Sequence, residues 1–328
     1  PGFDTNLFVN GISSKDYSAL RDSPDVPLFN RAVQGQYPPG STVKPIMGMA
    51  GLESGLVTPE TTVPDPGWYR LPGDSRRYRD WILRIRGTGH APLVDLKMAI
   101  AESCDVYFYD LARRLTIDRM HDYLEPYGMG NRTGIDTTNE RRGVLPSTRW
   151  KREAMAQAWY PGETLSAGIG QGYVLTTPLQ LAVATTVLAS RGERRVPRFL
   201  MAVGGEQVEA PVLEPIVASE ANWDAVHDGM LEVVHGKRGT AKQLAKGIQY
   251  SMAGKTGTAQ VIGIAQNAVY NEEEVAERHR HHGLFIAFAP QEAPTIAVAI
   301  IVENGGGSSA ASPIAREVID TWLLGEAG

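Results

Sequence analysis

Residues 37–52 join a loop that cannot be helical to an apolar segment that can. The loop reads Tyr-Pro-Pro-Gly, in which the prolines exclude a helix, whereas residues 46–52 have the apolar spacing of one. Ser41 is therefore expected at or just inside a helix N-terminus, with Lys44 three residues later on the same face. A lysine amine beside a serine hydroxyl can accept its proton, and the Ser41 backbone N–H would be free to bind an oxyanion.

This Ser-x-x-Lys pair is weak evidence by itself. Serine and lysine are common, so the pattern should occur by chance roughly once in a chain of 328 residues. The alternative interpretation is an N-capped helix whose lysine is solvated. Other parts of the sequence have to decide between a nucleophile and a simple cap.

A second motif, Lys-Thr-Gly at residues 255–257, lies in a segment expected to be a β-strand. A glycine in a strand lets another backbone or a ligand approach closely, and the adjacent Lys255 could hold a carboxylate or a serine proton. The alternative is a strand end with a solvated lysine. Because this tripeptide is expected by chance only about a tenth of a time in such a chain, it counts for more than the first pair.

A third motif, Ser-Cys-Asp at residues 103–105, lies in the middle of a helix that the apolar spacing predicts over residues 94–115. Ser103 and Asp105 are poor helix formers in such a place. They indicate either a functional interruption or an ordinary buried kink, and the residues alone leave both interpretations open.

The remaining pattern predicts helices first and strands later. Helices are expected from Ser41 to about residue 55 and over residues 20–32, 177–190, 219–234 and 313–324, with Gly236 just beyond the helix that ends at 234. Strands are expected at residues 6–11, 252–261, 283–290 and 295–302. A loop rich in Pro, Gly and Asp runs to about residue 86, and its length indicates a functional or pinned segment. This order predicts one α+β domain over residues 1–328, helical at about 41–190, with its main sheet mostly in 250–303.

Composition excludes several classes of protein. With 42% hydrophobic and 21% charged residues the chain is globular rather than disordered, and a net charge of −5 gives no support to nucleic-acid binding. The single cysteine excludes an internal disulfide, and no apolar run approaches the length of a membrane span. The abrupt start at residue 1, without a signal pattern, suggests a catalytic piece whose N-terminal anchor and pedestal lie outside it.

The three motifs occur in the order found in penicillin-recognising serine enzymes, and they resemble the Ser-x-x-Lys, Ser-x-Asn or Asp, and Lys-Thr-Gly triplet of that group. Residues 1–4, 10–11, 166–172 and 177–182 are similar to class B penicillin-binding transpeptidases, so the resemblance covers nearly the whole chain. Asp105, where most relatives have asparagine, is similar to the penicillin-binding protein 2 group of elongation transpeptidases. The implied fold is penicillin-binding and serine β-lactamase-like, with an antiparallel sheet packed with helices plus an all-helical subdomain.

The resemblance also implies acyl transfer on peptidoglycan stem peptides. Ser41 would attack the carbonyl of the penultimate D-Ala, Lys44 would take its proton, and the N–H groups of Ser41 and Thr258 would hold the oxyanion. Ser103 and Lys255 would relay a proton to the leaving amine. The substrate-binding residues would be Asp105, Thr256, Gly257 and Thr258. β-Lactams would acylate the same serine, and catalysis would need no cofactor.

Partners and cellular place are implied in the same way. They are a SEDS-family glycan polymerase and a scaffold protein of the elongation complex, at the periplasmic face of the bacterial inner membrane.

Two other functions stay open. A β-lactamase or D,D-carboxypeptidase would use water in place of the acceptor amine, although the chain is long for a β-lactamase and no deacylating glutamate follows the second motif at a familiar place. A β-lactam sensor or scaffolding domain would keep the pocket without turnover.

Four residues with metal-binding side chains, Asp65, Asp80, His90 and Cys104, lie in or beside the long loop. Carboxylate, imidazole and thiolate groups are an acceptable tetrahedral set for zinc. The resemblance to the penicillin-binding protein 2 group implies a structural zinc at such positions, which would pin the loop against the segment that carries Ser103. The alternative is a free buried cysteine and a surface histidine.

A second polar cluster, His279, His281 and His282, ends a polar and charged insertion over residues 265–282. Histidines on a mobile loop are more often solvated than liganding, and contact with a partner is the other interpretation. We therefore expect these three side chains to face solvent.

Overall fold

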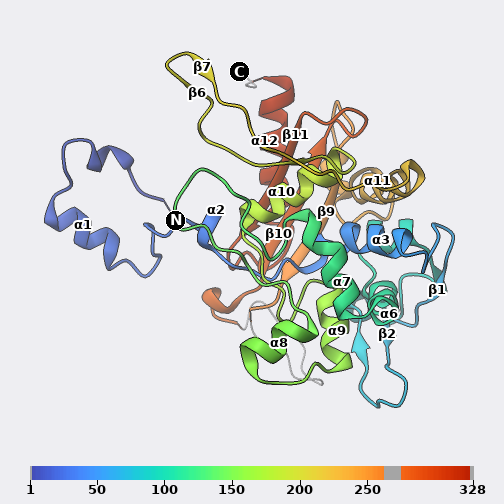
Figure 1. The fold of residues 1–328 in the computed structure, drawn as a ribbon. Coiled ribbons are helices and arrows are strands. Elements are labelled where there is room, and N and C mark those ends of the chain that lie inside the picture. The colour runs from blue at the N-terminus through green and yellow to red at the C-terminus, as the bar shows by residue number, and fades with distance from the viewer. Residues whose placement is uncertain (1, 262–274, 326–328) are drawn as a thin grey trace.

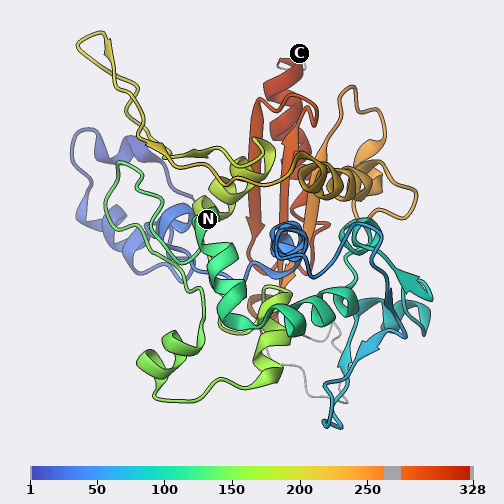
Figure 2. The same ribbon diagram turned by 45° about the vertical axis from the view of Figure 1, so that its right-hand side comes forward.

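The computed structural model describes residues 2–261 and 275–325. Among these residues the main sheet has three antiparallel strands, β9 (Ala253–Ala259), β10 (His282–Ala289) and β11 (Ile296–Val302), in the order β11-β10-β9 (Figures 1 and 2). All residues of β10 after His282 are buried, as expected of a strand whose two faces are both covered. The strands predicted between residues 252 and 302 are confirmed.

Three helices cover this sheet. α11 (Glu220–His235) packs along β9, while α10 (Pro178–Ala189) and α12 (Ser312–Leu324) pack against β10 and β11. The start of α10 is fixed by a reciprocal cap, because Thr177 accepts the backbone N–H of Gln180 and Gln180 accepts that of Thr177. The helices predicted for these segments are confirmed.

The helix that follows Ser41 runs through the middle of the fold. It begins as the 3-10 turn η2 (Gly40–Val43) and continues as α3 (Lys44–Glu53), in which every residue except Glu53 is buried. A helix buried on all sides belongs to the interior, and α3 contacts α5, α6, α7 and α11. The predicted helix from Ser41 to about residue 55 is confirmed.

The single helix predicted over residues 94–115 is wrong. The structure divides it into α5 (Leu96–Ala101) and α6 (Asp105–Leu115), and Ser103 lies between them with a left-handed φ of 58°. Cys104 is extended and is the N-cap residue of α6. Serine and aspartate compete with helical hydrogen bonds, so what looked like a helix interior is a boundary. A left-handed non-glycine residue is uncommon and often marks a functional site.

The long loop after α3 is folded into short paired segments. β1 (Val63–Pro64) pairs with β4 (Leu93–Val94), and β2 (Trp68–Tyr69) pairs with β3 (Tyr78–Arg79) in a hairpin, followed by α4 (Trp81–Arg86). The expectation of a pinned segment is confirmed. The part predicted to be all-helical also contains these two strand pairs, which are too short to leave a period-two pattern in the sequence.

The first 36 residues differ from their prediction. The expected strand at residues 6–11 is the 3-10 turn η1 (Thr5–Phe8), and α1 (Ser14–Arg21) with α2 (Arg31–Gln34) replaces the helix predicted over 20–32. Asp4 and Ser13 cap backbone N–H groups at these helix starts, and this local capping outweighs the apolar pattern. Figure 1 shows α1 projecting from the rest of the chain.

The remaining elements are short. They are α7 (Ile117–Leu124), η3 (Glu125–Tyr127), α8 (Thr148–Met155), α9 (Pro161–Gly168), β5 (Arg194–Arg195), β6 (Ala202–Val203), β7 (Glu206–Gln207), β8 (Val212–Leu213), η4 (Lys242–Ala245) and η6 (Glu277–His279). Gly236, predicted to lie just beyond a helix, is the C-cap of α11 itself with a φ of −77°, so it needs no left-handed backbone.

Two of the three clustered histidines belong to the packed structure. His281 is 6% exposed, and its Nδ1 accepts the backbone N–H of Val261 at 3.4 Å. The ring of His282, the first residue of β10, lies 5.4 Å from the Tyr37 ring. The expectation that they face solvent is wrong, because they border the sheet, whereas His279 is exposed as expected. Part of the predicted insertion, residues 265–274, lies outside the described residues.

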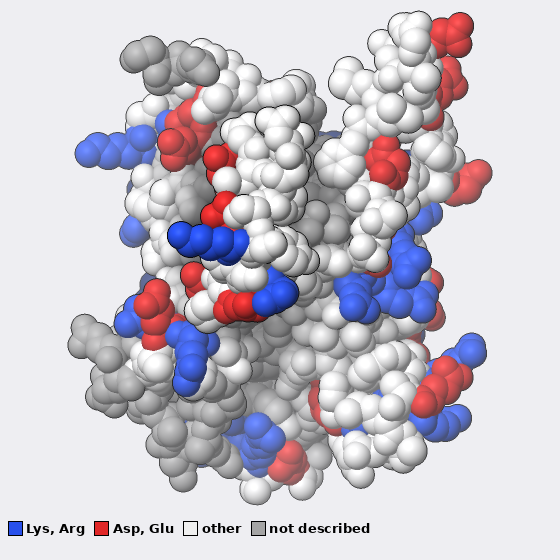
Figure 3. Space-filling model, turned by 90° about the vertical axis from the view of Figure 1, so that its left-hand side faces the viewer, with Lys and Arg blue, Asp and Glu red and all other residues white. Residues whose placement is uncertain are grey.

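The described surface gives two further facts. None of the described helices combines the length and apolarity needed to cross a membrane. On the face drawn in Figure 3, Lys and Arg side chains are interspersed with Asp and Glu. This face therefore offers no continuous basic stripe of the kind that a nucleic-acid backbone requires.

Candidate active site

The sequence motifs meet around the amine of Lys44. Its Nζ donates to the Ser103 carbonyl oxygen at 2.8 Å, and it lies 3.2 Å from Ser103 Oγ and 2.7 Å from Asp105 Oδ1. Ser41 precedes Lys44 by three residues in η2 and is partly exposed. A serine within reach of solvent and a buried amine one turn away are what a nucleophile and its base require.

Lys44 lies in a low-dielectric environment. Its side chain is fully buried, and the amine is 5.4 Å from the centre of the Phe108 ring. Asp105 forms an ion pair with it, and burial raises the pKa of the Asp105 carboxyl against the attraction of the Lys44 charge. The Asp105 carboxyl therefore binds a proton more readily than a solvated carboxyl does.

Lys255 is the second buried amine of the site. It is fully buried in β9, and its Nζ donates to the Thr256 carbonyl oxygen at 3.0 Å. Burial, together with the positive charge of Lys44, lowers the pKa of Lys255 well below its ordinary value. A lysine with a depressed pKa releases its proton more readily than a solvated lysine does, so it is better suited to relay a proton.

Strand β9 lies directly against the segment that carries Ser41. A Cβ on Gly257 would be 2.7 Å from Thr42 Cγ2, and a Cβ on Gly40 would be 2.5 Å from the Thr258 carbonyl oxygen. Any larger residue would force the two segments apart. The close approach that the sequence predicted for Gly257 is therefore present, and it sets the distance between the Lys-Thr-Gly strand and the segment that carries Ser41.

The outer edge of β9 faces this segment. The Thr258 carbonyl oxygen points out of the edge, where it accepts a hydrogen bond from Nε2 of Gln171 at 2.9 Å. In a strand the N–H and C=O of one residue leave from the same edge, so the Thr258 N–H points the same way. A Cβ on Gly40, the residue before Ser41, would be 3.3 Å from that nitrogen. Both predicted oxyanion donors thus belong to adjoining segments, and their role stays a prediction.

Two predicted substrate-binding residues already have partners within the protein. Asp105 is bonded to Lys44, and Thr256 is 6% exposed with its Oγ1 2.7 Å from Thr240 Oγ1. Thr258 is partly exposed and remains accessible to a ligand. The structure brings the predicted residues together, but direct contact of any of them with substrate stays a prediction.

Two further side chains of the site were missed by the sequence reasoning. Trp81 donates its Nε1–H to the Ser103 carbonyl oxygen at 3.1 Å, beside the Lys44 amine, and Gln171 holds the edge of β9. Gln171 belongs to the glycine-rich segment 166–172, which the family resemblance had already marked. Trp81 carried no signal, because its contact depends on how the long loop folds back.

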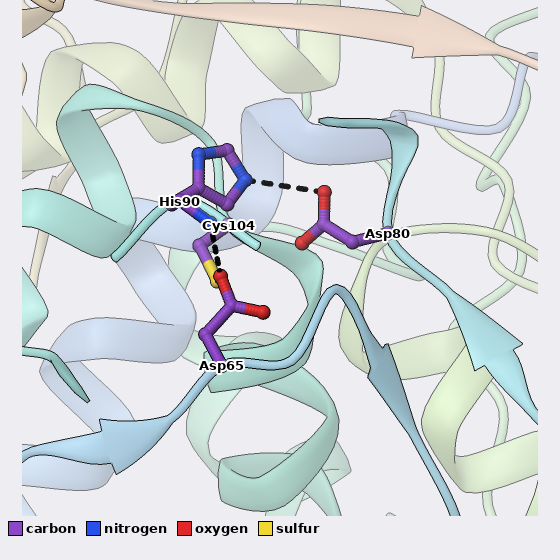
Figure 4. A group of neighbouring side chains, drawn as sticks. All are labelled: Asp65, Asp80, His90 and Cys104. Carbon is purple, nitrogen blue, oxygen red and sulfur yellow. Dashed lines mark hydrogen bonds and ion pairs between the residues drawn. The ribbon is translucent and has the colours of Figure 1, made fainter. Parts of the chain in front are cut away.

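The four predicted metal ligands form a buried cluster next to the Ser103 turn (Figure 4). One ligand atom from each of Asp65, Asp80, His90 and Cys104 lies within 4.8 Å of the others. His90 Nε2 is 3.1 Å from Asp80 Oδ1, and Cys104 Sγ is 3.5 Å from Asp65 Oδ2. The structure therefore confirms that these residues meet, while metal binding stays a prediction.

The donor set and its surroundings fit zinc. Zinc–ligand bonds of about 2.0–2.3 Å place tetrahedral ligand atoms about 3.3–3.8 Å apart, so the observed spacing requires only small movements. Glu102 Oε2 lies 3.4 Å from His90 Nδ1, the outer partner that usually orients a metal-binding imidazole. Asp80 Oδ2 accepts the backbone N–H groups of Asp105 and Val106 at 2.6 and 3.2 Å, which ties the cluster to the start of α6.

Negative groups dominate the electrostatics of this cluster. Burial alone would lower the pKa of His90, but hydrogen bonds to Asp80 and Glu102 outweigh burial and raise it to about 9. Burial, with Asp80 and Asp65 adding to it, raises the pKa of the Cys104 thiol well above its ordinary value. The raised pKa of His90, and the part that Asp80 and Asp65 add to the pKa shift of Cys104, indicate a negative field that a bound cation would relieve.

An α+β fold that gathers Ser-x-x-Lys, Ser-x-Asp and Lys-Thr-Gly around one buried amine defines the class of penicillin-recognising serine enzymes. Within that class, residues 1–320 match the penicillin binding protein transpeptidase domain, and the chain belongs to this family. The family and the fold class predicted from the sequence are therefore confirmed.

Individual relatives and solved structures belong to the same family. Peptidoglycan D,D-transpeptidase MrdA of Acinetobacter baumannii is 44% identical over 329 residues, which cover 99% of this chain and 48% of the relative. Penicillin-binding protein 2 of Pseudomonas aeruginosa, in complex with WCK 5153, superimposes with a TM-score of 0.89 at 46% identity, covering 100% of this chain and 70% of that one. Penicillin-binding protein 2 of Helicobacter pylori, in complex with MreC, superimposes with a TM-score of 0.85 at 35% identity, covering 98% of this chain and 56% of that one. The chain spans about half the length of the curated relatives it matches.

Proposed function

We propose that the protein is a D,D-transpeptidase that cross-links peptidoglycan stem peptides through a serine acyl-enzyme and is acylated by β-lactams at the same residue. The observation that carries this proposal is the buried Lys44 amine, held by Ser103 and Asp105 one turn from the partly exposed Ser41. The names of the relatives support the same activity.

Acylation begins at Ser41. Its hydroxyl oxygen attacks the carbonyl carbon of the penultimate D-Ala while Lys44 Nζ takes the proton, and Asp105 at 2.7 Å stabilises the resulting ammonium. The peptide C–N bond then breaks. Lys44 Nζ passes the proton it has taken to Ser103 Oγ at 3.2 Å, and Ser103 passes its own proton to the leaving nitrogen. The terminal D-Ala therefore departs with a neutral amine.

Backbone groups and the second lysine stabilise the intermediate. The oxyanion forms between the N–H groups of Ser41 and Thr258, two fixed donors that need no reorganisation as charge develops. Lys255, buried in β9 with a depressed pKa, completes the proton path to the leaving group. These steps use only side chains and backbone groups of the chain.

The second half of the reaction determines the enzyme class. In a transpeptidase the amine of a neighbouring stem peptide attacks the carbonyl carbon of the Ser41 ester. Lys44 takes the amine proton and passes it to Ser41 Oγ as the ester C–O bond breaks, so the new amide is released and the free serine returns. In a β-lactamase or carboxypeptidase, water takes that place, and a sensor stops at the ester. The names of the relatives favour the amine acceptor.

Partners and location follow from the same family. The complex of the Helicobacter pylori protein with MreC supports a scaffold protein of the elongation complex as a partner. The assignment of a SEDS-family glycan polymerase as a second partner, and of the periplasmic face of the bacterial inner membrane as the location, is based on the family resemblance. Together they would place cross-linking next to glycan synthesis.

The function is tested with a fluorescent penicillin and a reconstituted cross-linking reaction. We expect one covalent adduct, mapped to Ser41 by mass spectrometry, with slow release of the label, and cross-linked dimers when nascent glycan strands are supplied. Rapid turnover of the label would indicate a β-lactamase instead. A stable adduct without any cross-linked product from the wild-type protein would leave the sensor interpretation standing.

For the cluster of Asp65, Asp80, His90 and Cys104 we propose a structural zinc site. A zinc ion would be held by these four side chains and would fix the long loop to the N-terminus of α6 through the Asp80 contacts. Its contribution would be to stability, and no step of the reaction passes through it.

Purified without a chelator, the protein is expected to contain about one zinc per chain, and Cys104→Ser is expected to lose most of it. A chelator should lower the melting temperature of the wild-type protein and have little effect on Cys104→Ser, which separates binding at the cluster from adventitious metal. Glu102→Gln should weaken affinity by roughly 10- to 100-fold, because it removes the partner of His90. Absence of zinc from wild type and variant alike would refute the site.

A further inference from the structure

A cavity of about 740 Å³ lies between the β2–β3 hairpin, α6 and α9. The hairpin contributes Leu71, Arg76 and Tyr78 to its lining, α6 contributes Arg113, and Tyr160 lines it from the N-cap position of α9. None of these residues takes part in the acyl-transfer steps proposed above. The cavity is therefore a feature of the chain that the proposed chemistry leaves unexplained.

Two walls of this cavity lead to the catalytic centre. α6 begins at Asp105, the partner of Lys44, and Arg113 lies eight residues further, about 12 Å along the helix axis. α9 ends at Gly168, shortly before Gln171, which binds the edge of β9. An extended peptide of about four residues spans roughly 13 Å. A chain bound at the catalytic centre could therefore reach the cavity.

The hairpin is strongly basic although the whole chain is acidic. Residues 68–79 contain four arginines and one aspartate, against a net charge of −5 for the chain. The guanidinium of Arg77 lies 4.4 Å from the Trp68 ring centre, while that of Arg76 lies 4.9 Å from the Tyr78 ring centre and lines the cavity. Neighbouring arginines of one hairpin thus have different surroundings.

Most charges around the cavity are already paired. Glu163 forms an ion pair with the buried Lys151, and Arg113 donates its Nε–H to Tyr69 Oη at 2.7 Å and lies 3.7 Å from Asp110.

Asp74 also lines the cavity, and its Oδ1 accepts the backbone N–H of Arg76 at 2.9 Å. Within residues 2–261 and 275–325 the Arg76 guanidinium makes no ion pair, so this cation is available to an anionic ligand. Because Asp74 engages the hairpin backbone and the other hairpin charges are cationic, the local field favours an anion.

The wall that carries Arg76 is held in place. A Cβ on Gly162 would be 2.2 Å from Tyr78 Oη, so the hairpin docks closely on the start of α9. The Tyr78 ring also lies 6.0 Å from that of Tyr109, which is buried in α6. A guanidinium on a docked hairpin loses less conformational entropy on binding than one on a free loop.

We propose that this cavity binds a carboxylate of the peptide substrate several residues away from the bond that Ser41 attacks, with Arg76 as the cation that anchors it. Leu71, Tyr78 and Tyr160 supply apolar surface for the intervening part of the peptide. This assignment rests on the proposed transpeptidase function and adds to it a residue that selects the substrate.

Binding is measured in the Ser41→Ala protein, which cannot turn the peptide over. Two fluorescently labelled peptides end in D-Ala-D-Ala and differ in one group, a free carboxylate or a carboxamide three residues before the terminal D-Ala. Fluorescence anisotropy should give a dissociation constant roughly tenfold lower for the carboxylate peptide, the effect of one charge-assisted hydrogen bond. Arg76→Gln should abolish this preference, and Arg76→Lys should restore part of it.

Arg77→Gln is the matched control. It removes the same charge from the same hairpin but outside the cavity, so the carboxylate preference should persist. Equal loss in Arg76→Gln and Arg77→Gln, equal affinity for the two peptides before mutation, or no binding of either peptide at millimolar concentration would each overturn the assignment. Penicillin labelling and cross-linking of the protein with Ser41 intact test the proposed function separately, so a protein that passes them without a carboxylate preference keeps the function and loses only this subsite.

Discussion

Ser41→Ala is expected to abolish covalent labelling by fluorescent penicillin, with the second-order rate of acylation falling by roughly 10⁴-fold or more. Acyl transfer requires an oxygen nucleophile one turn from the Lys44 amine, and alanine leaves none at that position. The rate is measured from label retained on denaturing gels. Because Ser41 is partly exposed and makes no described side-chain hydrogen bond, the midpoint of thermal unfolding should change little.

Ser54→Ala is a matched control for this experiment. Ser54 is the C-cap of the same helix, and its hydroxyl donates to the Gly51 carbonyl oxygen at 3.0 Å, away from the three motifs. Its labelling rate should equal that of the wild type. Undiminished labelling of Ser41→Ala at another residue would mean that the nucleophile has been misassigned.

Local patterns predicted the parts of the site that depend on one element. The Ser41–Lys44 spacing follows from helix geometry, and residues 252–261 were recognised as a strand, so both motifs were assigned to the correct elements. Gly257 was likewise recognised as a position of close approach, because a strand glycine has few other uses. Each of these inferences needs only a few consecutive residues.

Features that depend on distant segments were not predictable in this way. The left-handed turn at Ser103 interrupts a sequence whose apolar spacing is that of one helix, and the turn is stabilised by contacts with Trp81 and Asp80 from the long loop. The burial of His281 depends in the same way on the sheet that it borders. A single sequence shows the residues of such contacts but not their pairing.

The proposed zinc site and the Lys44 amine share one short segment of chain. Cys104 belongs to the cluster of proposed zinc ligands, while its neighbours Ser103 and Asp105 hold Lys44. Asp80 joins the two by accepting the backbone N–H of Asp105. Fixing the cluster therefore also fixes the two groups that hold the proposed base, so this part of the long loop supports the site.

Lys44→Met is expected to have two separable effects. Acylation by penicillin should fall by roughly 10³- to 10⁴-fold, because the proton acceptor for Ser41 is lost. The free energy of unfolding should fall by about 3–5 kcal/mol, because the buried Asp105 carboxylate loses the cation that compensates it at 2.7 Å. Labelling kinetics measure the first effect, and urea unfolding monitored by circular dichroism measures the second.

The double variant Lys44→Met with Asp105→Asn distinguishes chemistry from folding. It removes the uncompensated charge, so much of the lost stability should return, while acylation should stay as slow as in Lys44→Met. If labelling recovered together with stability, Lys44 would be a structural partner of Asp105 and another group would be the base. If Lys44→Met labelled at the wild-type rate, the proposed mechanism would fail at its first proton transfer, because Ser41 would then be activated without the amine that the fold buries beside it.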